Sequence, residues 1–330
     1  MDRLSRRSFL GLLSAAAFLA ATRPALASTS RLRSSTRDAL GVTLFLELDH
    51  APFPCAGAPY RDNTVIVFVP SHFRAMRDAR VSVVVHFHGH NSSAERAMTN
   101  HQLREQLSDS KQDAILVVPQ GPLFAPDSSI GKLEAPGGFS RLVNDVIDTM
   151  KSDPGVRAAL GITGLDAEAQ LGTVCVSAHS GGYHAAACAT KDTTIEVNEV
   201  WLFDALYAEA ESFRTWVIAG KGKPMRQRHK LVNHYGDGTA GQSTQLLREL
   251  EQTGVKTVHE TIEGTLSRDE ITRAEAVFIH SALSHGALTH ELNSMRDCLF
   301  ASGLRRHVRA DWFANRVEAR HLDRRPSRER

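Results

Sequence analysis

The sequence predicts an α/β fold: a mostly parallel central sheet with helices on both faces, and antiparallel strands at its N-terminal edge. Short β-branched apolar runs alternate with helical patterns along most of the chain. Near-continuous apolar strands of this kind belong to sheets that are covered on both faces. The first three runs lack long helices between them, which indicates antiparallel pairing at the start of the sheet.

The elements follow in a regular order. The three early strands begin near residues 41, 63 and 80, and a helix follows from residue 93. Later strands are expected from residue 113 and over 172–178, 198–206, 229–236 and 275–283. Helices are expected over 139–150, after residue 180, over 210–220 and 242–250, and from about residue 289. The segments 160–172 and 258–272 follow neither period clearly.

The first 27 residues have the pattern of an export signal. Arg6 and Arg7 precede a short apolar run, which is followed by a small-residue cleavage site ending at Ala27. The apolar run is too short to span a membrane. The paired arginines resemble a twin-arginine signal, which implies the twin-arginine export machinery as a partner and a periplasmic or secreted location. The alternative is an anchor that is never cleaved.

Composition describes an ordinary soluble globular chain. Of its 330 residues, 42% are hydrophobic and 23% are charged. Without residues 1–27 the chain has 35 basic and 36 acidic residues. This near-neutral balance gives no reason to expect nucleic acid or an anionic membrane as a partner. Four scattered cysteines without a C-x-x-C pair do not form a disulfide scaffold or a zinc ribbon, and Cys175 is expected to be a buried apolar side chain.

An abrupt change of character at residue 180 is the main functional signal. The apolar run ending in "VSAH" is followed by Ser180, two glycines and a stretch of small residues that suits a helix. A sharp strand-to-helix turn lifts a serine above the sheet edge and directs a helix N-terminus at developing negative charge. Such a turn needs small residues two before and two after the serine, and here these are Ala178 and Gly182. The alternative is an ordinary turn with glycines for close packing.

The segment "AHSGG" resembles the nucleophile elbow of the α/β-hydrolase family, and the order of elements from about residue 40 to 303 resembles that fold. Alanine replaces glycine at the first position of the usual G-x-S-x-G. The resemblance implies a hydrolase domain over 40–315. It would be preceded by the signal peptide 1–27 and a linker 28–39, and followed by a basic, disordered tail over 316–330.

Histidines cluster in "VVVHFHGHNSS", where the third strand ends. The resemblance implies that the backbone N–H groups of His90 and Gly181 form the oxyanion hole. The alternative is a metal site, because His86, His88 and His90 alternate as they would on one face of a strand. The glycine between the last two, and the lack of a nearby aspartate, favour the oxyanion interpretation. We therefore expect no metal and no cofactor.

The resemblance places the general base after the last strand, where three histidines occur. His280 falls within the strand itself, and a structural role is expected for it. His290 would lie in the first turn of the following helix. His285 lies where the strand ends and is the preferred base, with a solvated loop histidine as the alternative.

Two aspartates compete as the acid of the triad. Asp204 ends an apolar strand at the same sheet edge as Ser180, whereas Asp237 follows the next strand, where the family most often carries its acid. In the usual spacing, however, the acid position falls nearer Thr239 than Asp237. Asp204 could instead cap a helix, and Asp237 could form a simple Asp-Gly turn. Asp204 is narrowly favoured.

These features predict an exported serine hydrolase that cleaves carboxylic esters or related acyl bonds, in small-molecule or polymeric substrates, through an acyl-enzyme on Ser180. Two alternatives remain open: a metal-dependent hydrolase that uses His86, His88 and His90, and a non-catalytic binding protein with a hydrolase fold.

Overall fold

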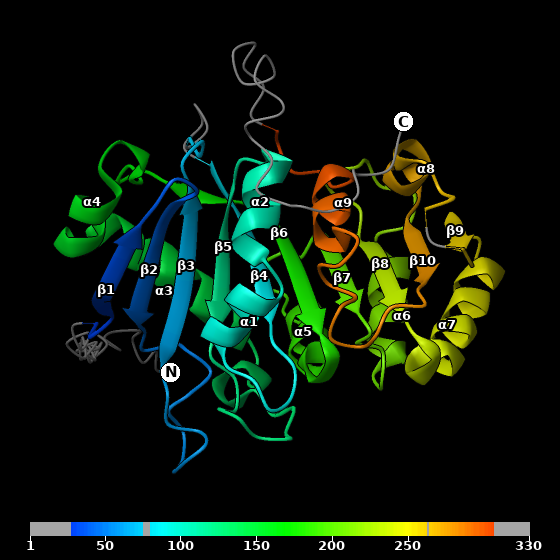
Figure 1. Cartoon of the computed structure of the whole chain (residues 1–330), viewed down its shortest axis with the longest axis horizontal. Helices are drawn as coiled ribbons and strands as arrows, with labels where there is room; N and C mark the ends of the chain where they lie inside the picture. Colours follow the sequence, from blue (N-terminus) through cyan, green and yellow to red (C-terminus); the bar gives the residue numbers. More distant parts are fainter. Residues whose placement is uncertain (1–27, 75–79, 263, 307–330) are drawn as a thin grey trace, which may run out of the picture.

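The computed structural model describes residues 28–74, 80–262 and 264–306. The expected export signal at 1–27 and the expected tail at 316–330 lie outside the described residues. A ten-stranded sheet runs through the described chain in the order β1-β2-β3-β5-β4-β6-β7-β8-β10-β9. Figure 1 shows this sheet from β1 at one edge to β9 at the other. The strands are β1 (Arg31–Arg37), β2 (Gly41–Glu47), β3 (Thr64–Pro70), β4 (Arg80–Phe87), β5 (Ala114–Pro119), β6 (Gln170–His179), β7 (Glu199–Phe203), β8 (Lys230–Tyr235), β9 (Thr257–Glu260) and β10 (Ala276–His280).

The direction of the strands confirms the predicted fold class. β1, β2 and β3 pair antiparallel with one another, and β3 is antiparallel to β5. From β5 onward every pairing is parallel. Parallel strands end at a common edge, and the carboxyl ends of β4, β6, β7, β8 and β10 therefore lie along one side of the sheet.

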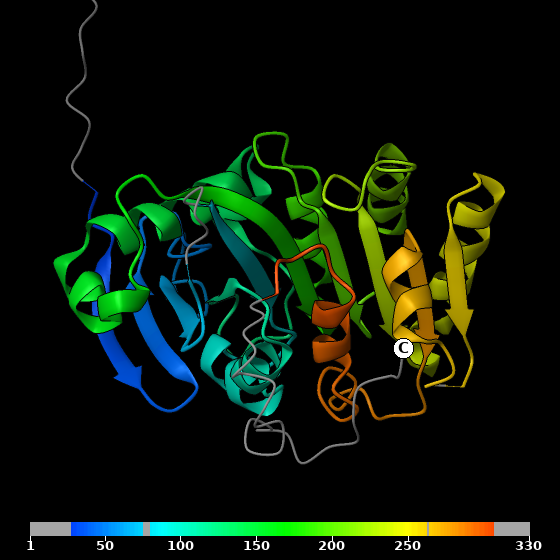
Figure 2. The same ribbon diagram turned by 90° about the horizontal axis from the view of Figure 1, so that it is seen from above.

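Helices cover both faces of the sheet, as Figure 2 shows. Side chains alternate between the faces: Val83 and Val85 pack in one core with α3 to α7, and Val84 packs in the other with α1, α2, α8 and α9. No described helix is long and apolar enough to cross a membrane. The helices are α1 (Ala94–Asn100), α2 (Leu103–Ser110), α3 (Gly138–Ser152), α4 (Pro154–Leu160), α5 (Tyr183–Thr190), α6 (Ala210–Ala219), α7 (Ala240–Gln252), α8 (Arg268–Arg273) and α9 (Ser294–Phe300).

Three details differ from the sequence prediction. The segment 28–39, which we expected to be a linker, contains β1, a polar and mostly exposed strand that joins the sheet by pairing with β2. An exposed edge strand needs backbone pairing but no apolar run, so its composition resembles that of a linker. The ambiguous segment 258–272 contains most of the short edge strand β9 and the start of α8. The last helix begins at Ser294 rather than near residue 289.

The cysteines all lie in the described part of the chain, and none of them is in a disulfide. Cys175 is completely buried in β6, as predicted.

Candidate active site

Ser180 lies at the predicted strand-to-helix corner. β6 ends at His179, a 3₁₀ turn covers Ser180–Gly182, and α5 begins at Tyr183. Ser180 has a φ of 53°, in the left-handed region. This conformation costs a non-glycine residue of the order of 1–3 kcal/mol, and it persists only where the surrounding structure enforces it. The corner is tightly packed, because a Cβ on Gly182 would lie 2.5 Å from the carbonyl oxygen of Phe87.

The loop after β4 runs directly against the side chain of Ser180. A Cβ built on Gly89 would lie 2.7 Å from the Cβ of Ser180 and 3.2 Å from Nδ1 of His179. Real Cβ atoms essentially never show a contact as short as the 2.7 Å one. Gly89 therefore allows the backbone of this loop to pass beside the serine, in the place where an oxyanion hole would have to be built.

His285 and Asp204 form a hydrogen-bonded pair beside this corner. Nδ1 of His285 lies 2.6 Å from Oδ2 of Asp204. Asp204 immediately follows β7, which pairs with β6, and His285 lies in the loop after β10. The carboxylate is buried, with 6% of its side chain exposed, whereas 44% of the His285 side chain is exposed. The imidazole is thus anchored at one nitrogen and still accessible from the surface.

Asp204 has further hydrogen bonds that hold it as an anion. Its Oδ1 accepts a hydrogen bond from Oγ1 of Thr239 at 2.5 Å and one from the N–H of Gly236 at 3.2 Å. Burial raises the pKa of Asp204, but the hydrogen bonds from His285, Thr239 and Gly236 outweigh it and lower the pKa to about 2. An anionic acceptor at Nδ1 fixes the neutral imidazole as the Nδ1–H tautomer, which leaves Nε2 able to accept a proton.

Asp237, the competing acid, lies apart from this pair. Its side chain is fully exposed, and its Oδ1 is 3.1 Å from Nε2 of His280. The usual acid position in the sequence spacing falls near Thr239, and there the structure places a hydroxyl that donates to Asp204. His280 ends β10 and bonds to Asp237 rather than to the His285–Asp204 pair.

His290 lies in a series of turns, not in the first turn of a helix. Backbone bonds join Ala287 to Ser284, His290 to Ala287 and Asn293 to His290. These i to i−3 bonds make tight turns, and the left-handed residue Asn293 separates them from α9. The prediction of a helix there was wrong because the polar, helix-like composition does not reveal this break.

His179 is a residue whose contacts the sequence did not indicate. Its Nε2 lies 3.0 Å from the carbonyl oxygen of His285, so the ring donates this hydrogen bond as the Nε2–H tautomer. The ring centroids of His179 and His285 are 4.7 Å apart, and those of His101 and His179 are 4.5 Å apart. Burial lowers the pKa of His179 to about 4. The residue before the serine is a variable position of the elbow motif. The motif therefore did not identify His179 as part of the site.

His90 lies on the other side of Ser180. A Cβ on Gly181 would lie 2.2 Å from Cδ2 of the His90 ring, so the imidazole lies directly over Gly181. Nε2 of His90 is 2.7 Å from Oγ of Ser128, which lies in the loop between β5 and α3. The two residues expected to form the oxyanion hole, His90 and Gly181, are thus in contact.

The other two histidines of this loop have separate partners. Nδ1 of His86 bonds to Oγ of Ser177 at 2.9 Å. Nδ1 of His88 donates to the carbonyl oxygen of Gly89 at 2.8 Å, and its Nε2 accepts the N–H of Gly121 at 2.9 Å. Burial lowers the pKa of His86 to about 3 and also lowers that of His88. Among the described residues, no group of three histidine, cysteine, aspartate or glutamate side chains is arranged to hold a metal ion.

Comparisons with known proteins add little to this geometry. No protein-family model matches the chain. No curated protein sequence matches it. Among solved structures, it is similar to an S-formylglutathione hydrolase from Agrobacterium tumefaciens, with 13% identity, 82% of this chain and 98% of that chain covered, and a TM-score of 0.43. A feruloyl esterase module from Clostridium thermocellum has 11% identity, with 86% and 91% covered and a TM-score of 0.46. A fluorophosphonate-binding serine hydrolase from Staphylococcus aureus has 10% identity, with 79% and 97% covered and a TM-score of 0.43.

Proposed function

We propose that this protein is a serine hydrolase that cleaves carboxylic esters through an acyl-enzyme on Ser180. The observation that carries the proposal is the 2.6 Å contact between Nδ1 of His285 and Oδ2 of Asp204, at the same sheet edge as a serine in a left-handed elbow. A buried anion, an oriented imidazole and a half-buried serine at a sharp turn are the three parts that activate a serine nucleophile.

Each residue has a distinct role in the proposed reaction. His285 accepts the Ser180 proton at Nε2 while the serine oxygen attacks the ester carbonyl. Asp204 stabilises the imidazolium that forms, and the N–H groups of His90 and Gly181 donate to the oxyanion. His285 then returns the proton to the leaving alcohol, and water releases the acid from Ser180 by the reverse sequence.

We further propose that the protein acts in the periplasm or outside the cell. The support for this is the twin-arginine-like pattern of residues 1–27 in the sequence. Fractionation of cells that carry the full chain, with and without an Arg6→Lys, Arg7→Lys change, tests this part alone. Retention of the variant in the cytoplasm is expected, and equal export of both forms would contradict it.

Hydrolysis of p-nitrophenyl acetate by the chain that lacks residues 1–27 tests the catalytic part. Ser180→Ala should reduce kcat by several orders of magnitude, because it removes only the attacking oxygen. Ser152→Ala is the matched control: this serine is exposed near the end of α3, and its loss should leave kcat unchanged. Equal activity of the Ser180→Ala variant and the unmodified chain would reject the proposal.

A further inference from the structure

The sheet order defines which side of Ser180 an acyl group would occupy, provided that the proposed function holds. β6, which carries Ser180, lies between β4 and β7. Asp204 follows β7, and His285 is bonded to it on that side. The leaving oxygen must lie within reach of His285, because His285 protonates it. The acyl substituent on the carbonyl carbon then points to the opposite side, toward the loop that follows β4.

The exposed side chain of His90, in the loop after β4, borders the acyl side. The imidazole lies over Gly181, so near that a single added Cβ on that glycine would overlap it. Its Nε2 is tied to Oγ of Ser128 at 2.7 Å, which joins the loop after β4 to the loop after β5. A carbonyl oxygen held by the N–H groups of His90 and Gly181 lies about 3 Å from both nitrogens, so the group attached to that carbonyl meets this ring.

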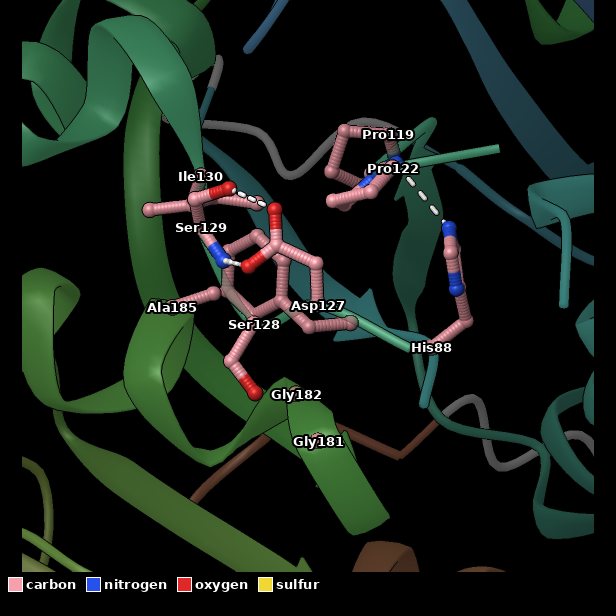
Figure 3. Close-up of a pocket in the computed structure, with 12 residues that line it drawn as sticks. His88, Pro119, Pro122, Asp127, Ser128, Ser129, Ile130, Gly181, Gly182 and Ala185 are labelled. Carbon is pink, nitrogen blue, oxygen red and sulfur yellow. Dashed lines mark hydrogen bonds between the residues drawn. The ribbon is translucent and has the colours of Figure 1, made fainter. Parts of the chain in front are cut away.

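A small cavity lies beside the Ser128 side chain and is also lined by Gly181 and Gly182. It extends between the end of β4, the 127–130 loop and the first turn of α5. In Figure 3, Ser128 points toward Gly181 and Gly182, with Ala185 on one side and His88 on the other. The cavity has a volume of about 10 Å³. That is about the space of one water molecule, comparable to a methyl group and too little for an alkyl chain.

From this arrangement we infer that the substrates are esters of short acyl groups, of the acetyl class, and that the His90–Ser128 pair determines this specificity. The backbone N–H of His90 serves the oxyanion, whereas its side chain limits the size of the acyl group. The two roles are separable, because truncation of the side chain leaves the N–H in place.

The test is a chain-length series of p-nitrophenyl acetate, butyrate and hexanoate. Its readout is the ratio of kcat/KM for hexanoate to that for acetate, which does not depend on the total amount of active enzyme. The unmodified chain should favour acetate by at least about 10-fold, since a pocket discriminates roughly 10–200-fold per misfitting methylene group. His90→Ala should raise the hexanoate-to-acetate ratio by about 10-fold or more.

Two further variants complete the test. Ser128→Ala keeps the ring but removes its anchor, and should raise the ratio less than His90→Ala does. It also keeps the inference testable if His90→Ala does not fold. His50→Ala is the matched control, because His50 is exposed and follows β2, three strands from β4 in the sheet, and its ratio should not change.

The possible failures are distinguishable. If the unmodified chain hydrolyses hexanoate as well as acetate, or if the ratio stays constant in both His90→Ala and Ser128→Ala, the inference on acyl size is overturned while the serine mechanism stands. If no ester of any length is hydrolysed, the proposed function fails and the inference fails with it.

Discussion

Oδ2 of Asp204 and Nδ1 of His285 are 2.6 Å apart, although the two residues are 81 positions apart in the chain. β7 and the loop after β10 bring them together at the carboxyl edge of the sheet. Asp204 also accepts hydrogen bonds from Thr239 and Gly236. It is therefore an oriented anion, which is the property that a triad acid requires and that a helix cap does not.

Asp204→Asn should lower kcat by about 10⁴, the loss that a wrong imidazole tautomer causes in Ser-His-Asp enzymes. Asparagine keeps the shape but offers an N–H or a weaker acceptor to Nδ1 of His285. Asp237→Asn is the matched control, because the Asp237 side chain is fully exposed and contacts His280 instead. Steady-state hydrolysis of p-nitrophenyl acetate measures both. If kcat is lost in Asp237→Asn and kept in Asp204→Asn, the acid is Asp237, after the later strand.

His285→Ala should reduce kcat nearly as much as Ser180→Ala, because the serine cannot attack unless its proton is removed. The double variant should lose little more than either single variant, as expected for groups that act as one unit. His280→Ala is the control, since its ring bonds to the exposed Asp237. Additive losses in the double variant would show that Ser180 and His285 act independently.

Gly89→Ala should impair catalysis without unfolding the chain. The added Cβ would lie 2.7 Å from the Cβ of Ser180, so either the serine or the loop must shift. Displacement of about 1 Å at a reacting group can cost about 10² in rate. Gly57→Ala is the control, because nothing lies within 4 Å of its added Cβ. A kcat within twofold of the unmodified chain for Gly89→Ala would contradict the close contact.

The buried histidines predict a loss of stability in acid. Burial lowers the pKa of His86 to about 3 and that of His179 to about 4, from an ordinary value of 6.5. In the unfolded chain both bind a proton below pH 6.5, whereas in the folded chain both stay neutral. The free energy of unfolding is therefore unaffected by these two groups above about pH 6.5. It falls progressively as the pH drops toward 4, because protons then bind the unfolded chain. At pH 5, which is about 1.5 units below the ordinary pKa, each histidine lowers the free energy of unfolding by about 2 kcal/mol, because each unit is worth about 1.4 kcal/mol.

Urea unfolding at pH 7, 6 and 5 measures this loss. The free energy of unfolding should fall by several kcal/mol across the series, and His179→Asn should flatten the dependence. The ring of His179 also faces His101, whose pKa is likewise lowered by burial, and His285, which lies beside the Asp204 anion. A stability that is equal at pH 5 and pH 7 would show that these rings are not held neutral by burial.

Much of the fold could be predicted because apolar periodicity determines buried strands. β2 to β8 and β10 are apolar runs, and their spacing predicted an antiparallel start and a parallel remainder. The third run, β4, was expected in the antiparallel start but pairs parallel with β5 and β6. β1 could not be predicted in this way, because an exposed edge strand is held by backbone pairing rather than by apolar side chains. The break before α9 depends on the left-handed Asn293, which composition does not reveal.

The candidate site was predictable only in part, for a similar reason. Ser180 is marked by the small residues that its corner requires, and His285 by its place after the last strand. The choice between Asp204 and Asp237 needed three-dimensional contacts, since both follow strands at the same edge. Thr239 donates a hydrogen bond to the carboxylate of Asp204, and His179 donates one to the carbonyl oxygen of His285. No local sequence pattern encodes contacts between residues this far apart in the chain.

The most direct test of the central claim is labelling with a fluorophosphonate probe, followed by peptide mapping by mass spectrometry. Such probes react with a serine that a neighbouring base activates, and no substrate needs to be known. The account predicts one adduct per chain, on the peptide that contains Ser180. It also predicts no adduct in Ser180→Ala and much slower labelling in His285→Ala. An unlabelled wild-type chain, or an adduct on another residue that persists in Ser180→Ala, would contradict the account.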